Sequence, residues 1–211
     1  MKEIVINKAF KTEIYSNNIV KNICNQFFGN RRFIYNKTLS IIEKILDKNY
    51  PIKYYTNVKI DDKTGVIKQQ DISLSNKKSF QFIGTMINEE YKFLSNSHSQ
   101  SNQEAIHSLH KAWSNYLNPE MKNFGKPKFK KRKYSNTFYL PNQNNISINE
   151  DNSIYIKPLD KFIKKELKDK KLLNSYNKLY LKKNLPKEFS KFDCKITGIT
   201  ISKDMNKMFI S

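Results

Sequence analysis

The chain has 211 residues, with 39 lysines and arginines against 19 aspartates and glutamates, which gives a formal net charge of +20. Hydrophobic residues make up 38% and aromatic residues 13% of the sequence, so a core is available and a wholly disordered chain is not expected. No apolar run approaches ~20 residues, which excludes a membrane-spanning helix. The two cysteines, Cys24 and Cys194, offer no disulfide framework. We therefore expect a cytoplasmic protein, associated with the nucleoid if its source is bacterial.

The first part of the chain predicts a strand followed by helices. Alternating apolar and polar residues predict a strand over residues 3–15, and residues 16–18 (Ser-Asn-Asn) carry side chains that cap helices. Apolar residues three and four apart then predict a helix that stops at Gly29 and a second helix over residues 31–48.

The middle of the chain predicts a hairpin and two further helices. Residues 52–72 predict a β-hairpin around an Asp-Asp-Lys-Thr-Gly turn. Helical spacing returns over residues 74–94 and is clearest over residues 105–117, where Trp113 is expected in the core.

The last part of the chain is rich in short strand-like segments. A Lys-rich amphipathic segment over residues 158–173 interrupts them. The predicted strands are residues 137–140, 146–148, 154–156, 196–201 and 207–210. The whole pattern predicts an α+β fold with one strand, a helical insertion and then several strands.

The excess of positive charge predicts a polyanionic partner, of which nucleic acid is the common one. An AT-rich genome would also enrich lysine, but it enriches acidic residues as readily, and here basic residues outnumber them two to one. The chain otherwise uses lysine, so Arg31, Arg32 and Arg132 indicate positions that need a planar guanidinium for phosphate or base edges. The alternative at each of these positions is that the arginine was retained by chance or forms a local ion pair.

Positive charge is densest over residues 125–134, where six cationic residues stand beside two aromatic ones and no acidic residue occurs. Lysines give salt-dependent phosphate contacts and aromatic rings stack on bases, while Pro127 stiffens the path. A solvated basic loop is the alternative. The predicted binding residues here are Lys126, Lys128, Phe129, Lys130, Lys131, Arg132, Lys133 and Tyr134.

A second predicted phosphate site lies at the start of the helix over residues 31–48. Free backbone N–H groups at a helix start favour anions, and Arg31 and Arg32 would repel the positive end of the helix dipole unless an anion came to occupy it. Tyr35 and Asn36 belong to the same predicted set. A guanidinium that caps a neighbouring helix or pairs with an acid is the alternative.

Metal and enzymatic sites are not expected. His107 and His110 are three residues apart, but Glu104, the nearest acid, is expected on another face of the helix. The acidic pairs at residues 61–62, 89–90 and 150–151 are sequence neighbours, whose side chains do not converge. No cofactor and no metal are therefore expected.

Five segments, taken in order, have the residues and spacing of a known family. They are Lys-Ala-Phe-Lys to Ile-Tyr at 8–15, Phe-Gly and Arg-Phe-Ile-Tyr-Asn with Leu at 28–39, the helix at 103–117, Gly-Lys-Pro-Lys-Phe-Lys at 125–130 and Thr-Gly-Ile-Thr-Ile-Ser at 197–202. They resemble the N-terminal half of the TnpB/OrfB family, transposon-encoded RNA-guided nucleases related to type V CRISPR effectors and Fanzor proteins.

The resemblance implies a wedge-type, oligonucleotide-binding-like β-barrel with an inserted helical recognition lobe. Residues 1–15 and 125–211 would form the barrel, and residues 16–124 the lobe. Guide-type RNA and DNA are the implied partners, without a membrane. Ser99, Gln103, Asn142 and Gln143 would contact DNA base edges, and Phe129, Tyr134 or Tyr139 would stack on unpaired bases.

The chain also departs from the family. Ser-Asn-Asn-Ile-Val at 16–20 replaces the usual Pro-Thr-x-x-Gln, and residues 52–72 and 158–187 look like insertions. The sequence stops where the RuvC-like nuclease half would begin, so the resemblance implies a nucleic-acid-binding fragment that does not cut DNA by itself. The alternatives are half of a split endonuclease with a separate RuvC-like product, a non-functional transposon relic, and a generic basic RNA-binding protein.

Overall fold

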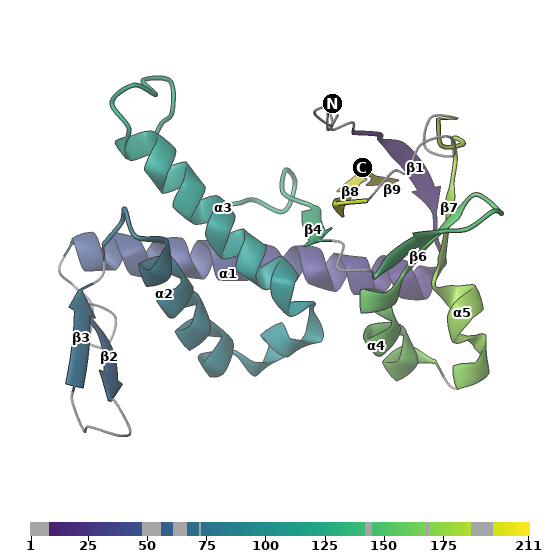
Figure 1. Ribbon diagram of the computed structural model, residues 1–211, viewed down its shortest axis with the longest axis horizontal. Coiled ribbons are helices and arrows are strands. Elements are labelled where there is room, and N and C mark those ends of the chain that lie inside the picture. Colours follow the sequence, from purple (N-terminus) through teal and green to yellow (C-terminus); the bar gives the residue numbers. More distant parts are fainter. Residues whose placement is uncertain are drawn as a thin grey trace, which may run out of the picture. The chain divides into compact units, whose positions relative to one another are not determined.

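The computed structural model shown in Figure 1 describes residues 9–47, 56–60, 67–71, 73–141, 145–167, 169–186 and 196–211. The chain divides into two compact units. We call Met1–Gln26 with Asn136–Ser211 the sheet unit, and Phe27–Ser135 the helical unit. The domain boundaries expected from the sequence stay a prediction.

A seven-stranded antiparallel sheet, in the order β4-β8-β9-β1-β7-β6-β5, forms the sheet unit. The N-terminal strand β1 therefore lies between strands from the end of the chain. The antiparallel sheet, together with the helices described below, confirms the α+β class. Closure into an oligonucleotide-binding-like barrel stays a prediction. The strands are β1 (Thr12–Tyr15), β4 (Thr137–Pro141), β5 (Ile146–Ile148), β6 (Ser153–Ile156), β7 (Lys178–Leu181), β8 (Gly198–Asp204) and β9 (Lys207–Ile210).

Strand β7 was not expected from the sequence. It pairs with β1 through Ile14 and Leu181 and with β6 through Ser153 and Tyr180, so it lies inside the sheet. Its alternation is short, only Lys-Leu-Tyr-Leu with both leucines buried, and it follows a Lys-rich stretch. The segment at 158–187 that looked like an insertion therefore supplies a central strand, besides the helices α4 (Lys157–Glu166), η3 (Lys170–Leu172) and α5 (Leu173–Tyr176).

One continuous helix, α1 (Asn18–Leu46), replaces the two helices predicted on either side of Gly29. Asn17 caps it, because its Oδ1 accepts a hydrogen bond from the Val20 backbone N–H at 2.9 Å. Gly29 does not stop the helix because a glycine inside a helix costs only about 1 kcal/mol. The buried side chains of Phe28 and Ile34 on either side offset that cost.

The helical unit packs α1 against α2 (Lys77–Glu90), η2 (Lys92–Asn96) and α3 (Ser99–Leu117). Gly84 of α2 allows a close approach to α3, because a Cβ at that position would overlap the side chain of Ile106. Trp113 is 2% exposed, as predicted for a core residue. Tyr116 and Leu117 were expected on the same apolar face but are exposed, since they lie one turn further, at the end of α3.

The predicted hairpin within residues 52–72 is present as β2 (Thr56–Ile60) and β3 (Ile67–Asp71), which pair antiparallel from Thr56 with Asp71 to Ile60 with Ile67. Its turn lies outside the described residues. None of the helices in the described part of the chain has the length and hydropathy needed to span a bilayer.

Candidate nucleic-acid interface

Residues 125–134, which we call the basic strap, are tied to α1 in the helical unit through one asparagine. The Asn36 side chain accepts a hydrogen bond from the Lys130 backbone N–H at 2.7 Å and donates one to the Lys130 carbonyl oxygen at 3.0 Å. Both bonds use the backbone of Lys130. The peptide groups on both sides of Lys130 are therefore held in place while its charged side chain remains available.

Two further contacts hold the ends of this region. The Arg32 guanidinium donates to the Ser135 carbonyl oxygen at 3.2 Å, and Lys126 pairs with Glu43 at 3.2 Å between Nζ and Oε1. Positions 32, 36 and 43 of α1 thus meet residues 135, 130 and 126 in turn. The strap therefore runs antiparallel to α1 over about 16 Å, at 1.5 Å per helical residue. Pro127 is buried at one end of the strap.

The strap presents its charged and aromatic side chains to solvent. Phe129 is 49% and Tyr134 75% exposed, which is unusual for such large apolar groups. Two lysines also lie over aromatic rings, Lys130 over Tyr35 and Lys133 over Tyr134, with 5.0 and 5.4 Å between Nζ and the ring centroid. The exposed cations are Lys126, Lys128, Lys130, Lys131, Arg132 and Lys133.

Arg31 and Arg32 do not lie at a helix start, so the predicted helix-terminus phosphate site is wrong. Because α1 continues through Gly29, both arginines lie in its middle, where backbone N–H groups are used within the helix. Burial lowers the pKa of the Arg31 guanidinium, while Glu104 of α3 acts in the opposite direction. Arg31 therefore has an acidic neighbour, in line with the local alternative.

Arg32 has a different environment. Burial lowers the pKa of its guanidinium, and the positive charge of Arg132 in the strap lowers it further. Two guanidinium groups of like charge thus lie near each other where the strap meets α1. A phosphate bound beside them would relieve this repulsion.

The other predicted binding residues are spread over both units. Tyr35 is 4% exposed and belongs to the core, so its ring supports Lys130 rather than offering a face to a base. Ser99 and Gln103 are exposed one turn apart on α3, as expected, and their base contacts stay a prediction. Tyr139 of β4 packs over Gly198 of β8, where a Cβ would overlap its hydroxyl. Asn142 and Gln143 lie outside the described residues.

In the described part of the chain, no group of three or more His, Cys, Asp and Glu side chains that could hold a metal ion occurs. Glu104 was expected on another face of α3, but its Oε2 lies 3.6 Å from Nδ1 of His107, one turn away. Gln81 is close to the other ring nitrogen of His107 at 3.2 Å. Burial lowers the pKa of His107, which favours the neutral ring.

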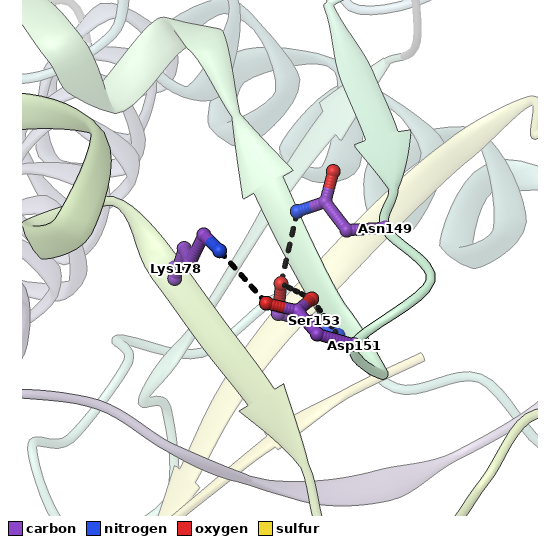
Figure 2. Close-up of polar contacts among 4 residues, drawn as sticks. All are labelled: Asn149, Asp151, Ser153 and Lys178. Carbon is purple, nitrogen blue, oxygen red and sulfur yellow. Dashed lines mark hydrogen bonds and ion pairs between the residues drawn. The ribbon is translucent and has the colours of Figure 1, made fainter.

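The sheet unit contains a separate polar network, which Figure 2 shows. Lys178 pairs with Asp151 at 2.7 Å, and the Ser153 hydroxyl donates to the same carboxylate at 2.5 Å while accepting from Asn149 at 2.9 Å. The hydrogen bond from Lys178 is the main cause that holds the pKa of Asp151 below its ordinary value. The network joins the β5–β6 turn to β7, and the Ser153 hydroxyl within it is fully buried.

A comparison with protein families matches residues 1–49 to the model HTH_OrfB_IS605, described as a helix-turn-helix domain. No curated protein matches the chain. In the described part of the matched segment, the structure has β1 and one uninterrupted helix rather than two helices joined by a turn. The segment includes Arg32, Asn36 and Glu43, which contact residues 126–135 through hydrogen bonds or an ion pair.

Proposed function

We propose that the protein binds nucleic acid through the basic strap, a proposal supported by the match of residues 1–49 to a helix-turn-helix model of the OrfB_IS605 family. A helix-turn-helix domain of this family indicates DNA binding in a transposon-associated protein. The strap adds a surface suited to RNA, so the proposed ligands are a guide-type RNA and DNA. The proposal assigns binding, without cleavage, to this chain.

The observation that carries the proposal is a strap held by its backbone and exposed through its side chains. The Asn36–Lys130 pair orders the strap before any ligand arrives, and a preorganised surface loses less entropy on binding. The exposed cations neutralise phosphates and release counterions. This arrangement favours a binding surface over a solvated loop.

The two exposed rings of the strap favour an RNA with unpaired bases. Phe129 and Tyr134 are the aromatic side chains of the strap that bases could reach. Protein recognition of RNA targets single-stranded loops and bulges, whose bases stack on aromatic rings. A duplex would meet the cations but leave these rings without a function.

The salt dependence of binding tests the proposal. We would compare the wild type with Lys130/Lys131/Arg132→Ala by fluorescence anisotropy, using a labelled RNA hairpin with an open loop. Removing three phosphate contacts should lower the log–log slope by about 2–3 units. The alanines keep the backbone bonds to Asn36, so the strap itself should stay in place.

A matched variant removes the same charge elsewhere. Lys161, Lys164 and Lys165 are exposed on α4 in the sheet unit. Their replacement by alanine should change the slope by less than about 1 unit. Equal slopes for the two triple variants would show that the charge acts non-specifically and would overturn the proposal.

The guide-type RNA and the absence of cleavage need their own readouts. The chain purified at moderate salt from its host should retain one discrete, structured RNA, and a bulk mixture would contradict a scaffold role. Incubation of that complex with labelled complementary DNA and Mg²⁺ should give no product. Cleavage would overturn the assignment of binding alone.

A further inference from the structure

A polar cleft of about 300 Å³ lies in the sheet unit, away from the strap in sequence. One wall is the first two turns of α1, and the other is the β8–β9 hairpin. We call it the asparagine cleft. Its lining residues are Asn18, Lys21, Asn22, Asn25, Lys203, Asn206 and Met208.

The residues of α1 that line the cleft share one face, since positions 18, 21, 22 and 25 follow helical spacing. Lys203 donates to Oδ1 of Asn25 at 3.3 Å, which joins the two walls. In the described part of the chain, the side chains of Lys21 and Asn22 have no hydrogen bond or ion pair. Asparagine is a weaker helix former than alanine, and no hydrogen bond within the described residues compensates for this at Asn22.

The chemistry of the lining fits one nucleotide. No lining residue is acidic and two are lysines, so the cleft favours an anion such as a phosphate. The buried Met208 provides an apolar floor for the flat face of a base. A side-chain amide both donates and accepts, which matches the N7 and N6 positions of adenine. Ligand pockets begin at about 300 Å³, which suits a single nucleotide rather than a duplex.

The tip of the hairpin has a second unusual feature. Met205, next to Asn206, has a φ of 48° and is 88% exposed. A left-handed backbone is unfavourable for a non-glycine residue, and methionines serve other nucleic-acid-binding proteins as apolar wedges between bases. An exposed apolar side chain on a left-handed backbone, beside a cationic cleft, suits a ligand with both flat faces and charge.

We infer that the asparagine cleft binds one unpaired adenine nucleotide within a single-stranded nucleic acid. Asn22 contacts the edge of the base, Met208 contacts its face, and Lys21 and Lys203 contact the flanking phosphates. The inference rests on the proposed function, since the strand must be bound by the protein. It adds a base preference that the strap does not supply.

The base preference can be measured with 12-nucleotide strands that differ at one position. We would use labelled uridine strands with a central A, G or C, and the thymidine DNA counterparts. The wild type should bind the A strand at least about fivefold more tightly, because a bidentate amide contact is worth about 1–3 kcal/mol. Asn22→Ala should remove this preference, and Asn22→Asp should do so without changing the shape of the side chain.

Two controls separate base reading from packing and from charge. Gln26→Ala changes an exposed residue of the same helix that does not line the cleft, so it should keep the preference. Lys21/Lys203→Ala should weaken all strands and lower the salt slope by about 1–1.5 units. Lys164/Lys165→Ala removes the same charge from α4 and should have a smaller effect.

The outcomes distinguish this inference from the proposed function. Equal binding of the A, G and C strands, a stronger preference for G, or an A preference that survives Asn22→Ala would overturn the cleft assignment alone, provided that the strap triple variant still loses affinity. Failure of the wild type to bind any strand or hairpin would overturn both. An A preference in RNA but not in DNA strands would identify the ligand as RNA.

Discussion

The basic strap and the network at the β5–β6 turn both collect charged and polar side chains, but they use them differently. In the network, Asp151 is paired with Lys178 and with the buried Ser153, so its charge is neutralised by the fold. In the strap, the protein holds the backbone through Asn36, and five of its six cations have no acidic partner within the described residues. Paired side chains stabilise the structure, whereas side chains left exposed on a fixed backbone are available to a ligand.

The largest stability effect expected on this comparison is Ser153→Ala in the network. The substitution removes a fully buried hydroxyl that donates to Asp151 and accepts from Asn149. The free energy of unfolding should fall by about 1–2 kcal/mol, measured by urea unfolding, while RNA affinity stays unchanged. A loss of RNA affinity at an unchanged free energy of unfolding would show that the network binds the ligand. It would contradict the distinction between a structural network and a ligand-binding strap.

Asn36→Ala should affect both stability and binding. It removes the two hydrogen bonds to the Lys130 backbone without removing any charge. The two exposed hydrogen bonds together stabilise the fold by about 1 kcal/mol. If the strap must be ordered to bind RNA, the same loss of free energy should weaken RNA binding about fivefold. Unchanged affinity in the anisotropy titration would show that preorganisation of the strap does not matter.

Acid should destabilise the sheet unit through its paired carboxylates. Hydrogen bonds from Lys178 and Lys182 are the main causes that lower the pKa values of Asp151 and Glu13. A lowered folded-state pKa adds stability above the unfolded value, near 4, which is lost as the pH falls through the folded value. The free energy of unfolding measured in urea should therefore fall below about pH 4. Asp151→Asn should make this fall with pH less steep. A variant with the wild-type pH profile would contradict the role of this pair.

The smallest difference is expected between two lysines of the strap. Lys126 already pairs with Glu43, whereas Lys128 is exposed and has no ion pair within the described residues. Lys128→Ala should lower the salt slope by about 0.7–0.9 units, and Lys126→Ala by less. The exposed Lys126–Glu43 pair should contribute no more than about 1 kcal/mol to stability. A larger change in the salt slope for Lys126→Ala than for Lys128→Ala would contradict the account, because Lys126 would then be the lysine more available to phosphate.

The sequence was sufficient where the signal is local. Strands β4, β5, β6, β8 and β9 follow from short alternating runs between turns, and α3 from its long apolar stripe. The predicted helix end at Gly29 was wrong, because the apolar stripe continues on both sides of the glycine and outweighs this local stop signal. Strand β7 has only four alternating residues, and its place depends on pairing with β1, which lies far away in sequence.

The same distinction applies to the candidate site. The positive charge of the strap is contiguous in the sequence and could be predicted from it. The hydrogen bonds between Asn36 and Lys130, in contrast, join residues 94 positions apart. The opposite environments of Arg31 and Arg32 also depend on tertiary neighbours, Glu104 and Arg132. The asparagine cleft was missed because its signal, three asparagines on one helix face, becomes meaningful only once the β8–β9 hairpin faces it.

Ultraviolet crosslinking of the protein to bound RNA, followed by mass spectrometry of the peptides, tests the central claim most directly. If the strap is the binding surface, crosslinks should concentrate on the peptide that contains Phe129 and Tyr134, the exposed rings that can stack on bases. They should disappear in Phe129→Leu/Tyr134→Leu, which removes both rings. Crosslinks that map to α4 or the β5–β6 turn instead, with none on the strap, would contradict the account.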